Sequence, residues 1–132
     1  MLTAFNFKIM EYKTYNGWYW IENNNAIDNK ESLINNRFTT TGKYLFFSDN
    51  KNELIELSKQ ILSEYNLFKA KVPESNTPNK SDGFGFVLCV YDCKNRYASE
   101  LKTYETNTIS YRYWKSDNAT RKHKYSKQYL RS

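Results

Sequence analysis

Residues 84–91, with the sequence FGFVLCVY, decide the fold of this chain. The run is apolar at successive positions, which is typical of a strand buried on both faces at the centre of a sheet. Working outward, residues 73–82 (PESNTPNKSD) have the composition of a loop, and residues 70–72 predict a strand that ends at Pro73. The middle of the chain therefore predicts two strands joined by a long loop.

Helical patterns flank this pair of strands. Upstream, residues 44–47 (YLFF) predict a strand, and a helix with apolar residues at helical spacing is expected from a cap at Asn50 to about Tyr65. Downstream, residues 97–104 predict a second amphipathic helix. Residues 109–114 predict the final strand.

The order from residue 43 to residue 114 is strand, helix, strand, strand, helix, strand, which is the split βαβ arrangement. The predicted fold class is therefore α+β: a mainly antiparallel, curved sheet with two helices on one face. The other face is expected to be free for a ligand or a further layer. Before this unit, residues 17–21 (GWYWI) predict a strand, and Asp28 with Glu31 predicts one helical turn.

The positive charge lies at one end of the chain. The net charge is +6, and residues 1–111 contain as many acidic as basic side chains. The excess therefore lies in residues 112–132, the basic segment, where Asp117 is the sole acidic residue. Such a block is typical of a surface that binds polyanions. A solvated tail that aids solubility is the alternative interpretation.

Length and composition narrow the class of protein. At 132 residues the chain is expected to form one α+β domain, 1–132. No stretch approaches the roughly 18 apolar residues of a membrane span, and we expect a cytoplasmic protein without a membrane partner. Cys89 and Cys93 would lie about 13 Å apart along a strand, too far for a disulfide. No metal site is predicted.

Residues 82–89 (DGFGFVLC) resemble the RNP1 string of RNA-recognition motifs and fall on the third strand of the βαββαβ unit, where that string belongs. The resemblance implies that Phe84, Phe86 and Tyr44 stack on bases from the free sheet face. Two positions depart from the pattern, because an acidic residue replaces the leading basic one and a cysteine replaces the final aromatic. A buried core strand would show the same alternation of apolar residues.

A longer resemblance covers roughly residues 42–130. The segments GKYLFF, VLCVY and YRYWKSDNAT follow one another as in the uncharacterised basophilic-leukaemia-expressed protein family, which the chain resembles. The comparable positions of the late segment are Tyr113, Lys115, Ser116, Asp117 and Thr120, with Trp114 as an insertion. The resemblance implies the fold of the messenger-RNA cap-binding initiation factors, a curved antiparallel sheet backed by helices. It does not imply cap binding.

Some relatives in that family carry a phosphothreonine-lyase label, which implies a general base such as lysine and a general acid such as histidine. His123, the only histidine, lies between Lys122 and Lys124, a pattern that an exposed surface residue shares. The sequence contains no Walker-type loop, nucleophile elbow or carboxylate set with metal spacing. We therefore predict no catalytic residue and no cofactor.

The basic segment interleaves cations with aromatic rings, a mixture that can pair with phosphates and stack on bases. The predicted phosphate ligands are Arg112, Lys115, Arg121, Lys122 and Lys124. The predicted stacking residues are Tyr113, Trp114, Trp18, Trp20, Tyr44, Phe84 and Phe86.

The sequence thus favours a non-enzymatic binding protein for a phosphate-bearing ligand, RNA or a nucleotide. One alternative is a small phage or mobile-element protein that binds and inhibits a host nucleic-acid-handling complex. The other is a lyase or another enzyme that acts on a phosphorylated substrate.

Overall fold

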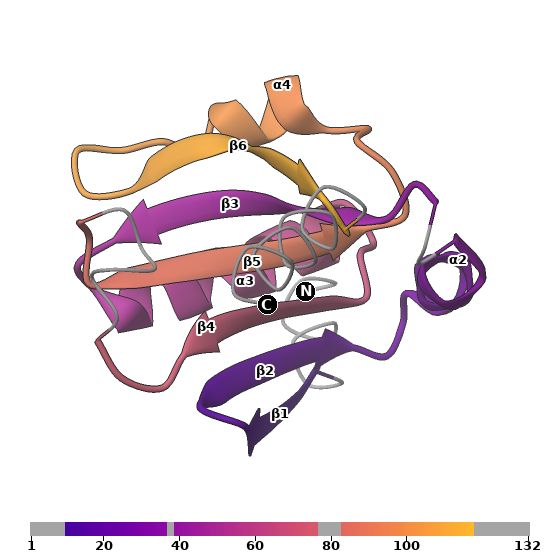
Figure 1. The fold of residues 1–132 in the computed structure, drawn as a ribbon, viewed down its shortest axis with the longest axis horizontal. Helices are drawn as coiled ribbons and strands as arrows, with labels where there is room; N and C mark the ends of the chain where they lie inside the picture. The colour runs from indigo at the N-terminus through magenta and orange to yellow at the C-terminus, as the bar shows by residue number, and fades with distance from the viewer. Residues whose placement is uncertain (1–9, 37–38, 77–82, 118–132) are drawn as a thin grey trace, which may run out of the picture.

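A computed structural model describes residues 10–36, 39–76 and 83–117 of the chain. Within these residues six strands form one antiparallel sheet in the spatial order β1-β2-β4-β5-β3-β6 (Figure 1). The strands are β1 (Met10–Tyr15), β2 (Trp18–Asn23), β3 (Gly42–Ser48), β4 (Lys69–Pro73), β5 (Phe86–Asp92) and β6 (Ser110–Ser116). The helices are α2 (Ile27–Asn36), α3 (Lys51–Glu64) and α4 (Ala98–Lys102). The predicted α+β class is confirmed.

The predicted split βαβ unit runs from β3 to β6. Its strands lie in the order β4-β5-β3-β6, so the β3-α3-β4 half and the β5-α4-β6 half interleave. The hairpin of β1 and β2 extends the sheet beyond the β4 edge. Helix α3 lies behind the sheet in Figure 1, α4 lies near β6, and α2 lies at one end of the sheet. Among the described residues no helix is both long and apolar enough to cross a membrane.

The β1–β2 hairpin differs from the sequence-based prediction, in which Gly17 begins a strand, because Gly17 lies in the turn that joins β1 to β2. Asn16 and Gly17 both have positive φ angles, 54° and 81°, and they join Tyr15 to its partner Trp18. Positive φ at both central positions of a two-residue loop matches the right-handed twist of the flanking strands. Gly17 is thus a turn residue, and the strand begins after it.

Helix α3 begins directly after Asn50, the cap residue predicted from the sequence. The backbone of Asn50 is extended, and its side chain accepts a hydrogen bond from the Glu53 N–H at 3.2 Å. This bond satisfies one of the N–H groups that the first turn of a helix leaves unpaired. The buried face of α3 consists of Leu54, Leu57, Ser58, Ile61 and Leu62.

Helix α2 is longer than the single turn predicted from its capping pattern. Its sequence, IDNKESLINN, has few apolar residues, and Asn29 and Leu33 are its buried side chains. The Asn29 side chain donates to Asp92 Oδ1 at 3.1 Å and accepts from the Phe68 N–H at 2.9 Å. Tertiary hydrogen bonds therefore extend this helix beyond what local sequence indicates.

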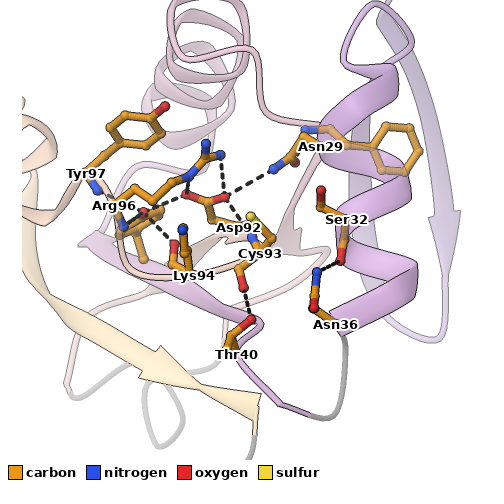
Figure 2. A network of polar contacts seen from close by, with 11 residues as sticks. Asn29, Ser32, Asn36, Thr40, Asp92, Cys93, Lys94, Arg96 and Tyr97 are labelled. Carbon is orange, nitrogen blue, oxygen red and sulfur yellow. Dashed lines mark hydrogen bonds and ion pairs between the residues drawn. The ribbon is translucent and has the colours of Figure 1, made fainter.

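The partner of Asn29 belongs to a buried polar network at the end of β5 (Figure 2). The Asp92 carboxylate is fully buried and accepts from Arg96 Nη2 at 2.8 Å and from the Tyr44 hydroxyl at 2.8 Å. The Tyr44 oxygen in turn accepts from the backbone N–H groups of Arg96 and Tyr97. The network joins α2, β3, β5 and the segment before α4, and it fixes the end of the sheet.

The two faces of the sheet carry different side chains. The helix face packs against α3 and α4 and contains the larger apolar cluster, with Tyr44, Phe46, Leu88, Val90 and Ile21 among its buried residues. On the opposite face, which we call the lysine face, Leu45, Phe47, Val87 and Cys89 form a second buried cluster. The centre of the face that was expected to be free is therefore a small apolar core, and the lysines described below border it. Cys89 and Cys93 are free thiols, as predicted.

Candidate functional site

The register of β2 and β4 places a row of lysines beside a row of tryptophans. Trp20 pairs with Lys71 and Glu22 with Lys69, while Ile21 pairs with Ala70. Because side chains alternate along a strand, Ile21 and Ala70 point to the helix face and the other four to the lysine face. The sequence KAKVP of β4 thus divides into two core residues and two lysines on one face.

Three ammonium groups converge on the ring of Tyr91. The Nζ atoms lie 5.6 Å from the ring centroid for Lys43, 4.9 Å for Lys69 and 5.9 Å for Lys71. Trp20 stacks on Tyr91 with a centroid separation of 6.0 Å, and the ammonium groups of Lys69 and Lys71 lie 5.4 Å and 5.2 Å from its centroid. Aromatic faces attract cations through their quadrupole. These rings therefore hold ammonium groups together that would otherwise repel one another.

The second tryptophan of β2 contributes to the same arrangement. The Lys71 ammonium lies 3.9 Å from the Trp18 centroid, the shortest of these cation–ring distances. Trp18 and Trp20, both predicted as stacking residues, thus lie on the lysine face with their rings against lysines. We call the set of Lys43, Lys69, Lys71, Trp18, Trp20 and Tyr91 the lysine–aromatic cluster.

The lysines of this cluster are only partly neutralised. Lys43 Nζ lies 4.0 Å from the Asp117 carboxylate, and within the described ranges no ion pair of 4.0 Å or less involves Lys69 or Lys71. Burial lowers the pKa of both Lys69 and Lys71, and the positive charge of Lys43 lowers both further. A site that lowers lysine pKa values favours an anion, since an anion would restore the stability of the charged form.

Two hollows lie beside the cluster, and Lys69 lines both. The larger, with a volume of about 420 Å³, is lined by Lys13, Thr14, Tyr15, Trp20, Glu22 and Lys69. The smaller, of about 200 Å³, lies toward α2 and is lined by Lys30, Leu33, Ile34, Thr41, Phe68, Lys69, Tyr91 and Asp117. The volume of the larger hollow is in the range of pockets that hold small ligands. It combines an aromatic wall with lysines and the Glu22 carboxylate, which can accept hydrogen bonds.

Strand β6 brings three predicted site residues to the lysine face. Lys115 pairs with Lys43, and Tyr113 pairs with Leu45 and is 52% exposed. A register shift follows, and the Arg112 guanidinium lies 5.6 Å from the ring centroids of both Phe47 and Phe84. Arg112, Lys115, Tyr113 and Phe84 therefore share a face with the lysine–aromatic cluster.

The positive charges of three lysines act on the buried thiol of Cys89. Burial raises its pKa, and the positive charges of Lys71, Lys43 and Lys115 each oppose that shift. The lysines of β3, β4 and β6 thus act on one point at the centre of the face. The predicted residue Lys115 joins the cluster electrostatically.

Three predicted stacking residues lie on the helix face: Tyr44, Trp114 and Phe86. Tyr44 is fully buried and packs against Trp114 with a centroid separation of 4.8 Å, and its hydroxyl is used in the Asp92 network. Phe86 packs against the same core cluster, whereas Phe84 packs against the opposite one. The three residues of the RNP1-like interpretation therefore do not share a face, because residues 83–85 form a turn and bend before β5 begins at Phe86.

The remaining predicted residues, Arg121, Lys122 and Lys124, lie outside the described residues, as does His123. Sequence reasoning missed Lys43, Lys69, Lys71 and Tyr91. The signal for two of them was present, since a lysine at each alternate position of a predicted strand places both on one face. Within the described part of the chain no group of three His, Cys, Asp or Glu side chains is arranged to hold a metal ion.

Comparison with known proteins adds no relative to this description. No protein-family model matches the chain, and neither a curated protein nor a solved structure shows significant similarity to it. The resemblance to the basophilic-leukaemia-expressed family therefore stays a prediction.

Proposed function

We propose that this protein is a non-enzymatic binding protein for a phosphate-bearing ligand, RNA or a nucleotide, and that the lysine face binds it together with the basic segment. The observation that supports the proposal is the convergence of the Lys43, Lys69 and Lys71 ammonium groups on Tyr91. Ammonium groups placed among aromatic rings offer charge for phosphate and ring surface for a base.

The surroundings of the cluster support the same class of ligand. Arg112 and Lys115, the first cations of the basic segment, extend the positive charge of the lysine face along β6. Tyr113 and Tyr15 are exposed by 52% and 65%, so their rings are accessible to a base. A single-stranded or mononucleotide ligand suits this arrangement, because its bases are not paired within a duplex.

The proposal is tested by fluorescence titration with a single-stranded RNA of random sequence at low and high salt. Trp18 and Trp20 lie in the cluster, so their emission reports on the site. The test variant is Lys69→Met/Lys71→Met, which keeps the apolar stems and removes two charges. The matched control is Lys94→Met/Lys102→Met, which removes two charges from exposed positions outside the lysine face.

We expect salt-sensitive binding for the native protein and the control. The test variant should bind more weakly, with a slope of log affinity against log salt that is smaller in magnitude by about 1.4, since each lost phosphate contact contributes about 0.7 on a single strand. Equal binding by the test and control variants would contradict a site at the cluster.

An Arg121→Ala/Lys122→Ala variant separately measures the contribution of the basic segment. Native protein that binds no RNA and no mononucleotide at low salt would refute the proposal. Capture of a protein partner by the same protein would then favour the inhibitor alternative.

A further inference from the structure

The lysine–aromatic cluster concentrates positive charge at one point, whereas the backbone of a nucleic acid distributes negative charge along its length. Three ammonium groups lie within 5.9 Å of the Tyr91 centroid. An internal phosphodiester carries one negative charge. A phosphate monoester carries about 1.5 to 2 negative charges at neutral pH and has three acceptor oxygens. The charge density of the cluster matches the monoester better than the diester.

The two carboxylates near the cluster offset only part of its positive charge. Asp117 accepts hydrogen bonds from the Thr41 hydroxyl at 2.7 Å and, through Oδ1, faces Lys43 at 4.0 Å. Glu22 lies 3.4 Å from Lys13 Nζ. Both carboxylates oppose the lowering of the Lys69 pKa, but these two negative charges are shared among the ammonium groups of Lys13, Lys43, Lys69 and Lys71, so a bound anion would add to them.

The position of the larger hollow adds a geometric reason. It borders the cluster at Lys69 and Trp20. Its volume of about 420 Å³ is in the range of small-ligand pockets and is large enough for one nucleoside. A nucleotide whose base and sugar occupied this hollow would have its phosphate near Lys69, which lines the hollow.

Resting on the function proposed above, we propose that the lysine–aromatic cluster selects a terminal phosphate, the monoester or polyphosphate of a free nucleotide or of an RNA end, over internal phosphodiesters. Lys69 and Lys71 contact the phosphate oxygens as point charges. Trp20 and Tyr15 line the adjoining hollow and contact the terminal nucleoside.

The test compares an oligouridine of about ten nucleotides that carries a 5′-hydroxyl, a 5′-monophosphate or a 3′-monophosphate, with uridine monophosphate as the free nucleotide. At constant ionic strength, we expect the 5′-monophosphate to bind at least about tenfold more tightly than the 5′-hydroxyl form, because a charge-assisted contact is gained. In Lys69→Met/Lys71→Met this difference should disappear, while Lys94→Met/Lys102→Met should retain it.

The different ligands distinguish the possible sources of the phosphate. They also distinguish failure of this inference from failure of the proposed function. Tighter binding of the 3′-monophosphate as well would assign the site to either RNA end, and tight binding of uridine monophosphate alone would assign it to free nucleotides; both support terminal-phosphate selection. Equal, salt-sensitive affinity for the hydroxyl and monophosphate RNAs would overturn this inference and leave the proposed function standing. Absence of binding in every arm at low salt would overturn both.

Discussion

Replacement of Asp92 by asparagine tests whether the network in Figure 2 holds the end of the sheet. Asp92 Oδ1 accepts from Arg96 Nη2 at 2.8 Å, the Cys93 N–H at 2.7 Å and Asn29 Nδ2 at 3.1 Å. Oδ2 accepts from the Tyr44 hydroxyl at 2.8 Å and Arg96 Nε at 3.2 Å. An asparagine keeps the size of the side chain, but whichever oxygen its NH₂ group replaces, at least two donors lose Asp92 as an acceptor.

The expected loss of stability follows from the burial of Asp92. Asp92 is fully buried, and a buried donor left without a partner costs about 1–3 kcal/mol, so two of them cost about 2–6 kcal/mol. The Arg96 side chain remains 33% exposed and regains water, which favours the lower half of that range. We expect Asp92→Asn to reduce the free energy of unfolding by about 3 kcal/mol, and to lower Tm by about 10 °C.

Urea and thermal unfolding, followed by circular dichroism, measure this change. Arg96→Met serves as the comparison, because it leaves the carboxylate its three other donors, from Tyr44, Asn29 and Cys93. A Tm for Asp92→Asn within about 2 °C of the native value would refute the network as a source of stability, since one lost buried hydrogen bond alone exceeds that shift.

Three further predictions concern single positions. A Cβ at Gly42 would lie 2.5 Å from the Lys115 carbonyl oxygen and 2.6 Å from Trp114 Cζ2, so Gly42→Ala should cost about 1–3 kcal/mol in urea unfolding, and an unchanged midpoint would contradict the close approach of β3 to β6. Asn50→Ala should cost about 1 kcal/mol by removing the α3 cap, whereas Asn50→Asp should retain most of the stability; equal losses in both would argue against capping. Because burial lowers the pKa of Lys69 and Lys71, affinity for the 5′-phosphorylated RNA should begin to decline at a pH below the ordinary lysine pKa of about 10.4; an affinity constant to about pH 10 would show that these ammonium groups do not bind the phosphate.

Much of the fold was predictable because its signals are local. The Asn50 cap and the apolar spacing of α3 are read within one helix, and the continuous apolar run of β5 reflects burial on both faces. The Asn16-Gly17 dipeptide was also a local signal for the β1–β2 hairpin, and it was misread as the start of a strand. The length of α2 depends on hydrogen bonds from Asn29 to residues far along the chain, which no local pattern indicates.

The candidate site was predictable only in part, since it depends on which face each strand presents. Arg112 and Lys115 were predicted from charge, and Trp18 and Trp20 from their alternation; all four lie on the lysine face. Trp114 pairs with Tyr44 and therefore lies on the helix face. The register shift between Leu45 and Phe46, which places Arg112 on the lysine face, has no signature in the sequence.

The distribution of charge shows why composition alone located the site incompletely. Residues 1–111 have no net charge, yet some of their described charged side chains are grouped by sign in the fold. Lys43, Lys69 and Lys71 lie on one face of the sheet, whereas a hollow of about 670 Å³ between α3 and residues 103–109 is lined by Glu53, Glu56, Glu64 and Glu105. In the proposed complex, the local grouping of charge would orient a polyanion toward the lysine face, an effect that depends on where the charges lie rather than on net charge. Residues 1–111, which are neutral as a whole, therefore contribute positive charge to the proposed site in addition to that of the basic segment.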